Sequence, residues 1–149
     1  MIRWRRYMLS QTTGYAIQAL GFLATKSDFT LIREIATETQ VPQGYLAKIL
    51  HQLARKGILE TQRGKKGGVR LAPGNEKMSF FEVAELMDDP VVTMRCMMGT
   101  AQCSPTRHCP CHDFWSKQRE REQALLRRKT LKDMARFYRK HAKRERQSR

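Results

Sequence analysis

The sequence predicts a mainly α-helical chain that carries one small β-hairpin, and three observations lead to this class. Apolar residues recur at helical spacing in three successive segments before Gly57. Two short β-prone runs, residues 58–62 and 69–72, then flank the basic, glycine-rich turn RGKKGG. Finally, residues 113–141 contain neither proline nor glycine, which indicates one long C-terminal helix.

The first three helices are delimited by ordinary capping and breaking residues. The first covers residues 10–26, with Ser10 as its N-cap. The second begins after Thr30, whose hydroxyl is expected to cap it, and ends before Pro42 because the residue ahead of a proline is disfavoured in a helix. Pro42 suits the first turn of the third helix, which Gly57 ends.

A fourth helix follows the hairpin. Ser79 and Glu82 have the spacing of a capping box, and Pro90 ends the helix. The proposed division of the chain is a DNA-binding domain (8–74), a linking helix (75–93), a cysteine-rich loop (94–112), a dimerisation helix (113–141) and a basic tail (142–149). Because the long helix cannot bury its apolar face on so small a domain, we expect it to contact a second copy in part.

The charge of the chain favours a polyanionic partner. Its 149 residues have a formal net charge of +15, which suits nucleic acid or an acidic membrane surface. No stretch approaches the roughly 20 apolar residues of a membrane span, so we expect a cytoplasmic protein without a membrane partner. In that compartment thiols stay reduced, and clustered cysteines typically bind metal or sense redox state.

The third helix and the hairpin together favour DNA. Two helices, a turn, a third helix and a basic hairpin follow the order of a winged helix-turn-helix, in which the third helix reads the major groove. A solvated helix face is the alternative for the helix alone; a phosphate-binding loop is excluded because the turn lacks the G-x-x-x-x-G-K spacing. Arg70 adds to the charge of the hairpin. The predicted DNA-contacting residues are Ser10, Gln43, Tyr45, Lys48, His51, Gln52, Arg63, Lys65, Lys66, Gly67 and Gly68.

All four cysteines lie between Cys96 and Cys111, in the pattern C-x6-C-x5-C-x-C-H that ends at His112. Structural zinc sites usually present two close cysteine pairs, and that pattern is absent here. Zinc, a bare thiol sensor, unligated structural cysteines and an iron–sulfur cluster all remain open on the residues alone. Several thiols beside one imidazole suit coordination better than the single activated thiolate of an enzyme, so we predict no enzymatic activity.

Three motifs carry a resemblance to a known family: LSQTTGYAIQAL, VPQGYLAKILHQLARKGIL and RGKKGGVRL, followed by the cysteine loop. Over roughly residues 8–137 the sequence resembles the bacterial winged-helix transcription regulators of the Rrf-two type, which include the iron–sulfur cluster regulator IscR, the nitric-oxide sensor NsrR and the cysteine regulator CymR. The resemblance implies a homodimer that binds a palindromic operator in double-stranded DNA through half-sites about one helical turn apart.

The same resemblance implies an iron–sulfur cluster in the loop, 2Fe–2S rather than 4Fe–4S, with zinc as the alternative. The implied ligands are Cys96, Cys103, Cys109 and His112. Cys111 has no counterpart in the family pattern and is an alternative fourth ligand. Gly14 stands where the nitric-oxide sensors resemble one another in carrying an aspartate, which weakens a nitric-oxide assignment.

The function predicted is therefore that of a dimeric, sequence-specific transcription regulator, with repression as the expected action, that senses iron–sulfur, redox or nitric-oxide status. A thiol- or zinc-based regulator of the same fold is one alternative. Binding of structured RNA and delivery of clusters to other proteins are two more. Residues 1–7 precede the start of the resemblance and are either slack at the start of the chain or an additional minor-groove arm.

Overall fold

The computed structural model describes residues 8–93, 95–99 and 102–147, so the N-terminal extension 1–7 lies outside the described residues. The predicted mainly helical class with a two-stranded hairpin is confirmed. The elements are α1 (Gln11–Leu23), α2 (Ile32–Thr39), α3 (Gln43–Arg55), β1 (Leu59–Gln62), β2 (Gly68–Leu71), α4 (Phe80–Leu86), α5 (His112–Arg128) and α6 (Leu131–Gln147). Short 3-10 turns cover Asn75–Lys77, Pro90–Val92 and Pro105–Arg107. No helix in the described ranges is long and apolar enough to cross a membrane.

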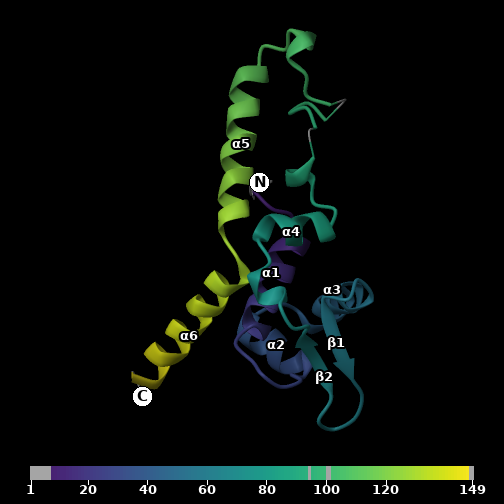
Figure 1. Cartoon of the computed structure of the whole chain (residues 1–149), viewed down its shortest axis with the longest axis vertical. Helices are drawn as coiled ribbons and strands as arrows, with labels where there is room; N and C mark the ends of the chain where they lie inside the picture. Colours follow the sequence, from purple (N-terminus) through teal and green to yellow (C-terminus); the bar gives the residue numbers. More distant parts are fainter. Residues whose placement is uncertain (1–7, 94, 100–101, 148–149) are drawn as a thin grey trace, which may run out of the picture.

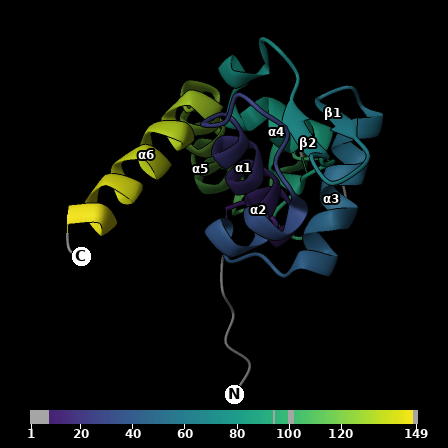
Figure 2. The ribbon, with the colours of Figure 1, turned by 90° about the horizontal axis from the view of Figure 1, so that it is seen from below.

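The elements form a body and an arm. Figure 1 shows α1 to α4 and the hairpin gathered in the body, whereas α5 stands away from it, with the described parts of residues 90–111 running alongside. Seen from below in Figure 2, α6 leaves on one side of α1, while α3 and the hairpin lie on the other side. α3, called the reading helix below because it is predicted to read DNA, and the C-terminal helix α6 are thus on opposite sides of the body.

The core of the body is built around α1 and α3. Leu20 and Leu23 of α1 are buried against Leu46, Leu50 and Leu53 of α3. Those three α3 residues make a single stripe, which leaves the opposite face of the helix free for polar side chains. The apolar face of the helix that is predicted to read DNA therefore holds that helix in the body.

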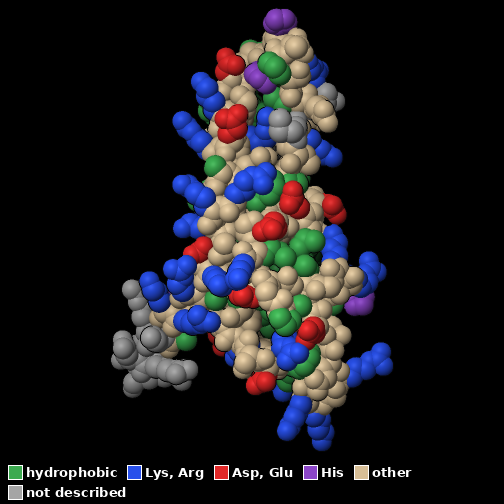
Figure 3. All heavy atoms as spheres, viewed as in Figure 1, with side chains coloured by type: hydrophobic (Ala, Val, Ile, Leu, Met, Phe, Trp, Pro, Cys, Tyr) green, Lys and Arg blue, Asp and Glu red, His purple; other side chains and the backbone are tan. Residues whose placement is uncertain are grey.

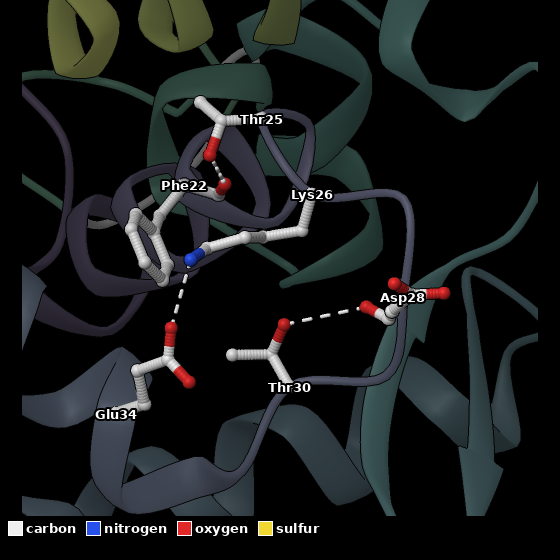
Figure 4. Close-up of polar contacts among 6 residues, drawn as sticks. All are labelled: Phe22, Thr25, Lys26, Asp28, Thr30 and Glu34. Atoms are coloured by element: carbon white, nitrogen blue, oxygen red, sulfur yellow. Dashed lines mark hydrogen bonds and ion pairs between the residues drawn. The ribbon is translucent and has the colours of Figure 1, made fainter.

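The cap predicted for α1 is confirmed, but the one predicted for α2 is wrong. The Ser10 hydroxyl accepts a hydrogen bond from the Thr13 amide at 3.2 Å. At α2 the N-cap position belongs to Leu31, with no side-chain cap. Thr30 instead pairs through its backbone with Val69 of β2, in two hydrogen bonds of 2.9 Å each. This pairing keeps Thr30 extended, and its hydroxyl is 3.4 Å from the Asp28 carbonyl (Figure 4).

The backbone geometry of the hairpin requires glycine at positions 67 and 68. β1 and β2 are antiparallel, with Glu60 opposite Arg70. Gly68 has a φ of 129°, and a Cβ atom there would collide with the Thr30 carbonyl. A Cβ at Gly67 would collide with the carbonyl of Gln62. Both glycines are therefore required by the backbone around them, whatever binds outside.

The predicted capping box of α4 is also confirmed. The Ser79 amide donates to Glu82 Oε2 at 2.6 Å, and the Glu82 amide donates to Ser79 Oγ at 3.2 Å. The helix ends at Leu86, and Pro90 starts the short turn that follows. Asp89 caps this turn by accepting from the Val91 amide.

The single helix predicted over 113–141 is wrong, because the structure divides it into α5 and α6 at Lys129 and Thr130. The Thr130 amide and hydroxyl both donate to Asp133 Oδ2, at 2.9 and 3.2 Å, which starts a new helix there. The Lys129 carbonyl accepts from the Phe80 amide at 2.8 Å, so α4 holds the break. α6 then continues to Gln147, beyond the predicted end at residue 141.

α6 packs against α1 of its own chain, although we expected the predicted long helix to contact a second copy in part. Leu131 and Ala135 are buried. The ring of Tyr138 meets Phe22 edge-on, with centroids 5.6 Å apart. α6 thereby completes the core of the body that holds the reading helix.

Candidate functional site

The outer face of α3 carries the predicted base-reading side chains. Four of them are exposed: Gln43, Tyr45, Lys48 and His51. Gln52 is half-buried. Amide, imidazole and ammonium groups on one helix face can meet base edges and phosphates together. The structure thus places these five residues on one accessible surface.

Tyr45 is the member of this face that is tied to another element. Its ring is 43% exposed, and its hydroxyl is 2.5 Å from Thr12 Oγ1 at the start of α1. The ring also meets Tyr15 edge-on, with centroids 5.6 Å apart. Any movement of the first turn of α1 would therefore reach the reading helix at Tyr45.

Ser10 has a structural task in addition to the predicted contact with DNA. Its hydroxyl is engaged with Thr13, and its amide donates to Asp89 Oδ2 at 2.9 Å. The side chain remains at the surface. Ser10 thus joins α1 to the segment that leads toward the cysteines.

The hairpin of β1, β2 and the turn between them (59–71) is called the wing below, and it presents three exposed cations, Arg63, Lys65 and Lys66. None of the three is in an ion pair within the part of the chain that the structure describes. Figure 3 shows Lys and Arg side chains projecting from the lower end of the molecule, where Figure 1 places the wing. Arg70 differs, because it pairs with Glu60 across the hairpin and lies over the Phe29 ring at 4.6 Å. The charge of Arg70 is thus engaged in contacts within the protein.

The cysteine loop closes around a small pocket of about 80 Å³. Cys96, Cys103, Cys109 and His112 all line it, together with Gln102, Ser104 and Arg107. Cys103 Sγ is 3.2 Å from His112 Nδ1. An isolated bridge between Arg95 and Gln102 closes the base of the loop, and the first turn of α5 supplies His112.

The donor set fits an iron–sulfur cluster by type, since thiolates with imidazole on one iron are known cluster ligands. The donor atoms, however, lie too far apart for one ion. Among the described residues, no three Cys, His, Asp or Glu side chains are close enough to hold a single metal ion. All four cysteines are free thiols. The loop therefore gathers the predicted ligands in one pocket, but their donor atoms do not converge on a common point.

Cys111 lies apart from this set. It stands at the N-cap position of α5, where its carbonyl accepts the Trp115 amide at 2.9 Å. It is not among the residues that line the pocket, whereas His112 is. The geometry therefore favours His112 over Cys111 as the residue that completes the pocket.

One face of α5 fastens the segment before Cys96, and this role was not predicted from the sequence. Trp115 Nε1 donates to the Arg95 carbonyl at 3.0 Å, and Gln123 Nε2 donates to the Val91 carbonyl at 2.9 Å. Between them Arg119 is only 7% exposed, and its Nη1 atom has no partner among the described residues. The helical spacing from His112 to Gln123 was the available signal for this face.

A buried carboxylate, Asp89, is a second residue whose contacts were not predicted from the sequence. Only 2% of it is exposed. Burial alone would raise its pKa, but hydrogen bonds from Thr13, Val91 and Ser10 together lower the pKa below its ordinary value. The carboxylate is thus held charged inside the body, where α1 meets the turn after α4. Pro90 indicated the end of the fourth helix here, but not the partners of Asp89.

Comparison with known proteins adds a family to this geometry. Residues 9–136 match the Rrf2 family, described as iron-dependent transcriptional regulators. The chain belongs to the Rrf2 family. This Rrf2 chain is similar to a protein of Aquifex aeolicus named as an HTH-type transcriptional regulator, at 30% identity over 137 residues that cover 90% of this chain and 95% of the relative. It is also 30% identical over 129 residues to the regulator NsrR of Oceanobacillus iheyensis, covering 85% of this chain and 88% of that one.

Solved structures agree on the fold of this Rrf2 chain. CymR, the global cysteine regulator of B. subtilis, superimposes with a TM-score of 0.69 at 20% identity, over 86% of this chain and 95% of CymR. T. potens IscR gives a TM-score of 0.64 at 20% identity, over 88% of this chain and 86% of IscR. The predicted family is confirmed, and this Rrf2 chain is a transcription regulator, not an enzyme.

Proposed function

We propose that this Rrf2 chain is a homodimeric, sequence-specific DNA-binding regulator whose DNA affinity depends on an iron–sulfur cluster held by Cys96, Cys103, Cys109 and His112. The observation that carries the proposal is the pocket that brings these four side chains together from a stretch of otherwise irregular chain. The family description, iron-dependent transcriptional regulator, supports iron as the metal.

The DNA interface consists of the outer face of α3 and the tip of the wing. The α3 side chains meet base edges in the major groove, and the wing cations meet phosphates beside it. Repression by occupying a palindromic operator follows from this arrangement in a two-fold symmetric dimer, with half-sites about 10 base pairs apart.

The dimer forms through α5. Phe114 is 68% exposed and Leu125 is 37% exposed on a helix that stands away from the body (Figure 1). Aromatic and aliphatic side chains on such an arm favour burial against another chain. A second copy of the same helix provides an apolar surface of matching length.

The residues of the pocket would act by fixing the loop to α5. When bound, the cluster supplies a redox-active centre that oxidants, nitric oxide or iron depletion can remove. Cys96 ends the segment fastened by Trp115, and His112 belongs to the first turn of α5. Joint binding by these residues holds the segment against the helix, and release of the ligands frees it.

The cluster is tested by anaerobic purification with visible absorbance and with iron and sulfide analysis. Wild-type protein is expected to be coloured, with iron and acid-labile sulfide in equal amounts. Cys103→Ala should be colourless but folded, whereas the control Cys111→Ser should keep the colour. Colourless wild-type protein with one zinc ion per chain would instead favour the zinc-based regulator, and colourless metal-free protein the thiol sensor.

DNA binding is tested with a palindromic duplex recovered by selection from random sequences. The dimer is expected to bind this duplex far more tightly than an unrelated duplex at equal salt, and the ratio should change when the cluster is removed. Preference for RNA hairpins over the duplex would contradict the proposal. So would transfer of clusters to other proteins without sequence-specific binding.

A further inference from the structure

Asp89 accepts hydrogen bonds from two elements that belong to different parts of the chain. Oδ2 accepts from the Ser10 amide at the start of α1, at 2.9 Å. Oδ1 accepts from the Val91 amide, also at 2.9 Å, in the turn that leads to the cysteines. Ser10 and Asp89 are 79 positions apart in the sequence. One buried carboxylate therefore fixes the distance between α1 and the turn Pro90–Val92.

Beyond Ser10, the contacts continue to the reading helix. The Ser10 hydroxyl caps the first turn of α1 through the Thr13 amide. In the same turn, Thr12 Oγ1 lies 2.5 Å from the Tyr45 hydroxyl on α3. A shift of this turn would therefore displace or release an exposed side chain on the DNA-facing surface.

Beyond Val91, the contacts continue to the pocket. The Val91 carbonyl accepts from Gln123, and the Arg95 carbonyl accepts from Trp115, so α5 holds this segment at two points. Cys96 follows Arg95 directly, and His112 opens the helix that carries both donors. α5 thus holds the chain at Val91, in the turn, and at Arg95, next to the pocket residue Cys96.

We propose that Asp89 is the positioning residue through which the state of the cysteine pocket is transmitted to the DNA-reading helix. This inference rests on the proposed function, because it concerns the regulation of that same site. Asp89 touches neither DNA nor metal. It acts by holding the first turn of α1 at a fixed distance from Val91. The chain at Val91 is held in place when the pocket residues bind the cluster and is freed when they release it.

The other capping carboxylates near the body do not have this geometry. Glu82 accepts from Ser79, three residues before it, and Asp133 accepts from Thr130 in the same local way. Each of them holds one helix end. Asp89 uses one oxygen for each of two elements, and an asparagine, which has a single acceptor oxygen, cannot replace it.

A route of contacts is only a proposal for coupling until a free-energy cycle measures it. The first test measures operator affinity with and without the cluster in the full-length protein. In the wild type, removal of the cluster is expected to change affinity by about 5- to 150-fold, the usual range of allosteric coupling. With Asp89→Asn this ratio should fall toward one. The control Glu82→Gln, which also loses a capping carboxylate, should keep the wild-type ratio.

The second test uses protein without metal and DNA, so that it does not depend on the proposed function. Trp115→Phe removes the donor to the Arg95 carbonyl, and amide hydrogen exchange is then followed at Thr13 and Gly14. Exchange there should become faster when Trp115→Phe is made in the wild type. It should not change further when Trp115→Phe is added to Asp89→Asn.

Two outcomes separate the inference from the proposed function. An unchanged affinity ratio in Asp89→Asn, or an equal effect of Trp115→Phe in both backgrounds, would overturn the role of Asp89 while leaving the cluster and DNA binding intact. Colourless wild-type protein, or protein without operator binding, would overturn the proposed function, and the exchange experiment would still decide whether Asp89 joins the two segments.

Discussion

Asp89 shows how a buried charge is kept inside this protein. A carboxylate removed from water costs free energy unless hydrogen-bond donors replace the lost solvent. Here the Ser10 and Val91 amides supply them, and the net effect is a pKa below the ordinary value of 3.8. Loss of one acceptor would leave an amide buried without a partner, at a cost of about 1–3 kcal/mol.

The lowered pKa predicts how stability depends on pH. Because the folded state binds the proton of Asp89 less readily than the unfolded state, the stabilisation is present above the unfolded value of 3.8 and is lost as pH falls through the folded pKa. Urea unfolding should therefore give a free energy that falls below about pH 4. Asp89→Asn should flatten this fall by up to about 1.4 kcal/mol per pH unit. An unchanged slope would mean that Asp89 is not charged in the folded protein.

Residue types in the pocket could be read from the sequence, whereas the residues that support them could not. Cys96, Cys103, Cys109 and His112 stand close together along the chain, so their gathering needed only a loop. Asp89 depends on a partner 79 positions away. The sequence around Ser10 or around Asp89 does not indicate this contact, because the same local sequence would occur whichever residue each of them contacted in the fold.

At the scale of elements, the contact between α1 and α6 depends on a glycine. Gly21 on α1 lies directly against Met134 on α6, and a Cβ at Gly21 would collide with the Met134 side chain close to its backbone. The two helices can approach this closely only because the glycine has no side chain. Gly14, on the same helix, has open space within 4 Å of the position of a Cβ.

These two glycines predict opposite effects of the same substitution. Gly21→Ala should destabilise the protein by about 1–3 kcal/mol, because overpacking forces α6 away from α1. Gly14→Ala should stabilise it by about 0.5–1 kcal/mol through helix propensity alone. Thermal and urea unfolding of both variants measure the difference. Equal effects of the two substitutions would contradict the close crossing of the helices.

Most elements of the fold could be predicted because their signals are local. The Ser10 cap, the hairpin glycines and the Ser79 capping box each lie within a few residues of the element they define. The break between α5 and α6 also had a local signal, since Thr130 and Asp133 have capping-box spacing. The uninterrupted absence of proline and glycine concealed it. Where α6 lies after the break is set by tertiary contacts with α1, which spacing does not reveal.

At the scale of the whole molecule, the positive charge is divided between two ends. The wing cations lie at the lower end of the body, and further Lys and Arg side chains follow the outer edge of the α5 arm (Figure 3). Of these two groups, the wing cations belong to the hairpin that directly follows the reading helix, whereas the α5 cations lie on the arm. The net charge of +15 therefore overstates the charge that we expect to neutralise DNA phosphates.

Salt dependence should separate these two groups of cations. Lys65→Ala together with Lys66→Ala should weaken binding to all duplexes and reduce the slope of log K against log salt by about two, close to one for each phosphate that is no longer neutralised. Lys117→Ala with Arg121→Ala on α5 removes the same charge far from the wing and should leave the slope nearly unchanged. Equal slopes in the two double variants would remove the wing from the interface.

The C-terminal helix should be necessary for the stability of the DNA-reading body. A chain that ends at Arg128 loses Leu131 and Ala135, both of which are buried, and exposes the face of α1 that they cover. Loss of these buried side chains should cost several kcal/mol, about 2–5 for the leucine alone. A chain that ends at His141 should keep nearly full stability. Urea unfolding compares the two, and equal stability would show that α6 is dispensable.

The return of α6 onto α1 also bears on how the protein is made. The core of the body lacks Leu131 until the ribosome has passed the cysteine loop and α5, which separate the body from α6 along the chain. Folding from the N-terminus, one domain at a time, is the usual order during translation. Here the body cannot be completed before α6 has been synthesised. Until then the nascent chain holds an incomplete body, and we expect specific DNA binding only from that point on.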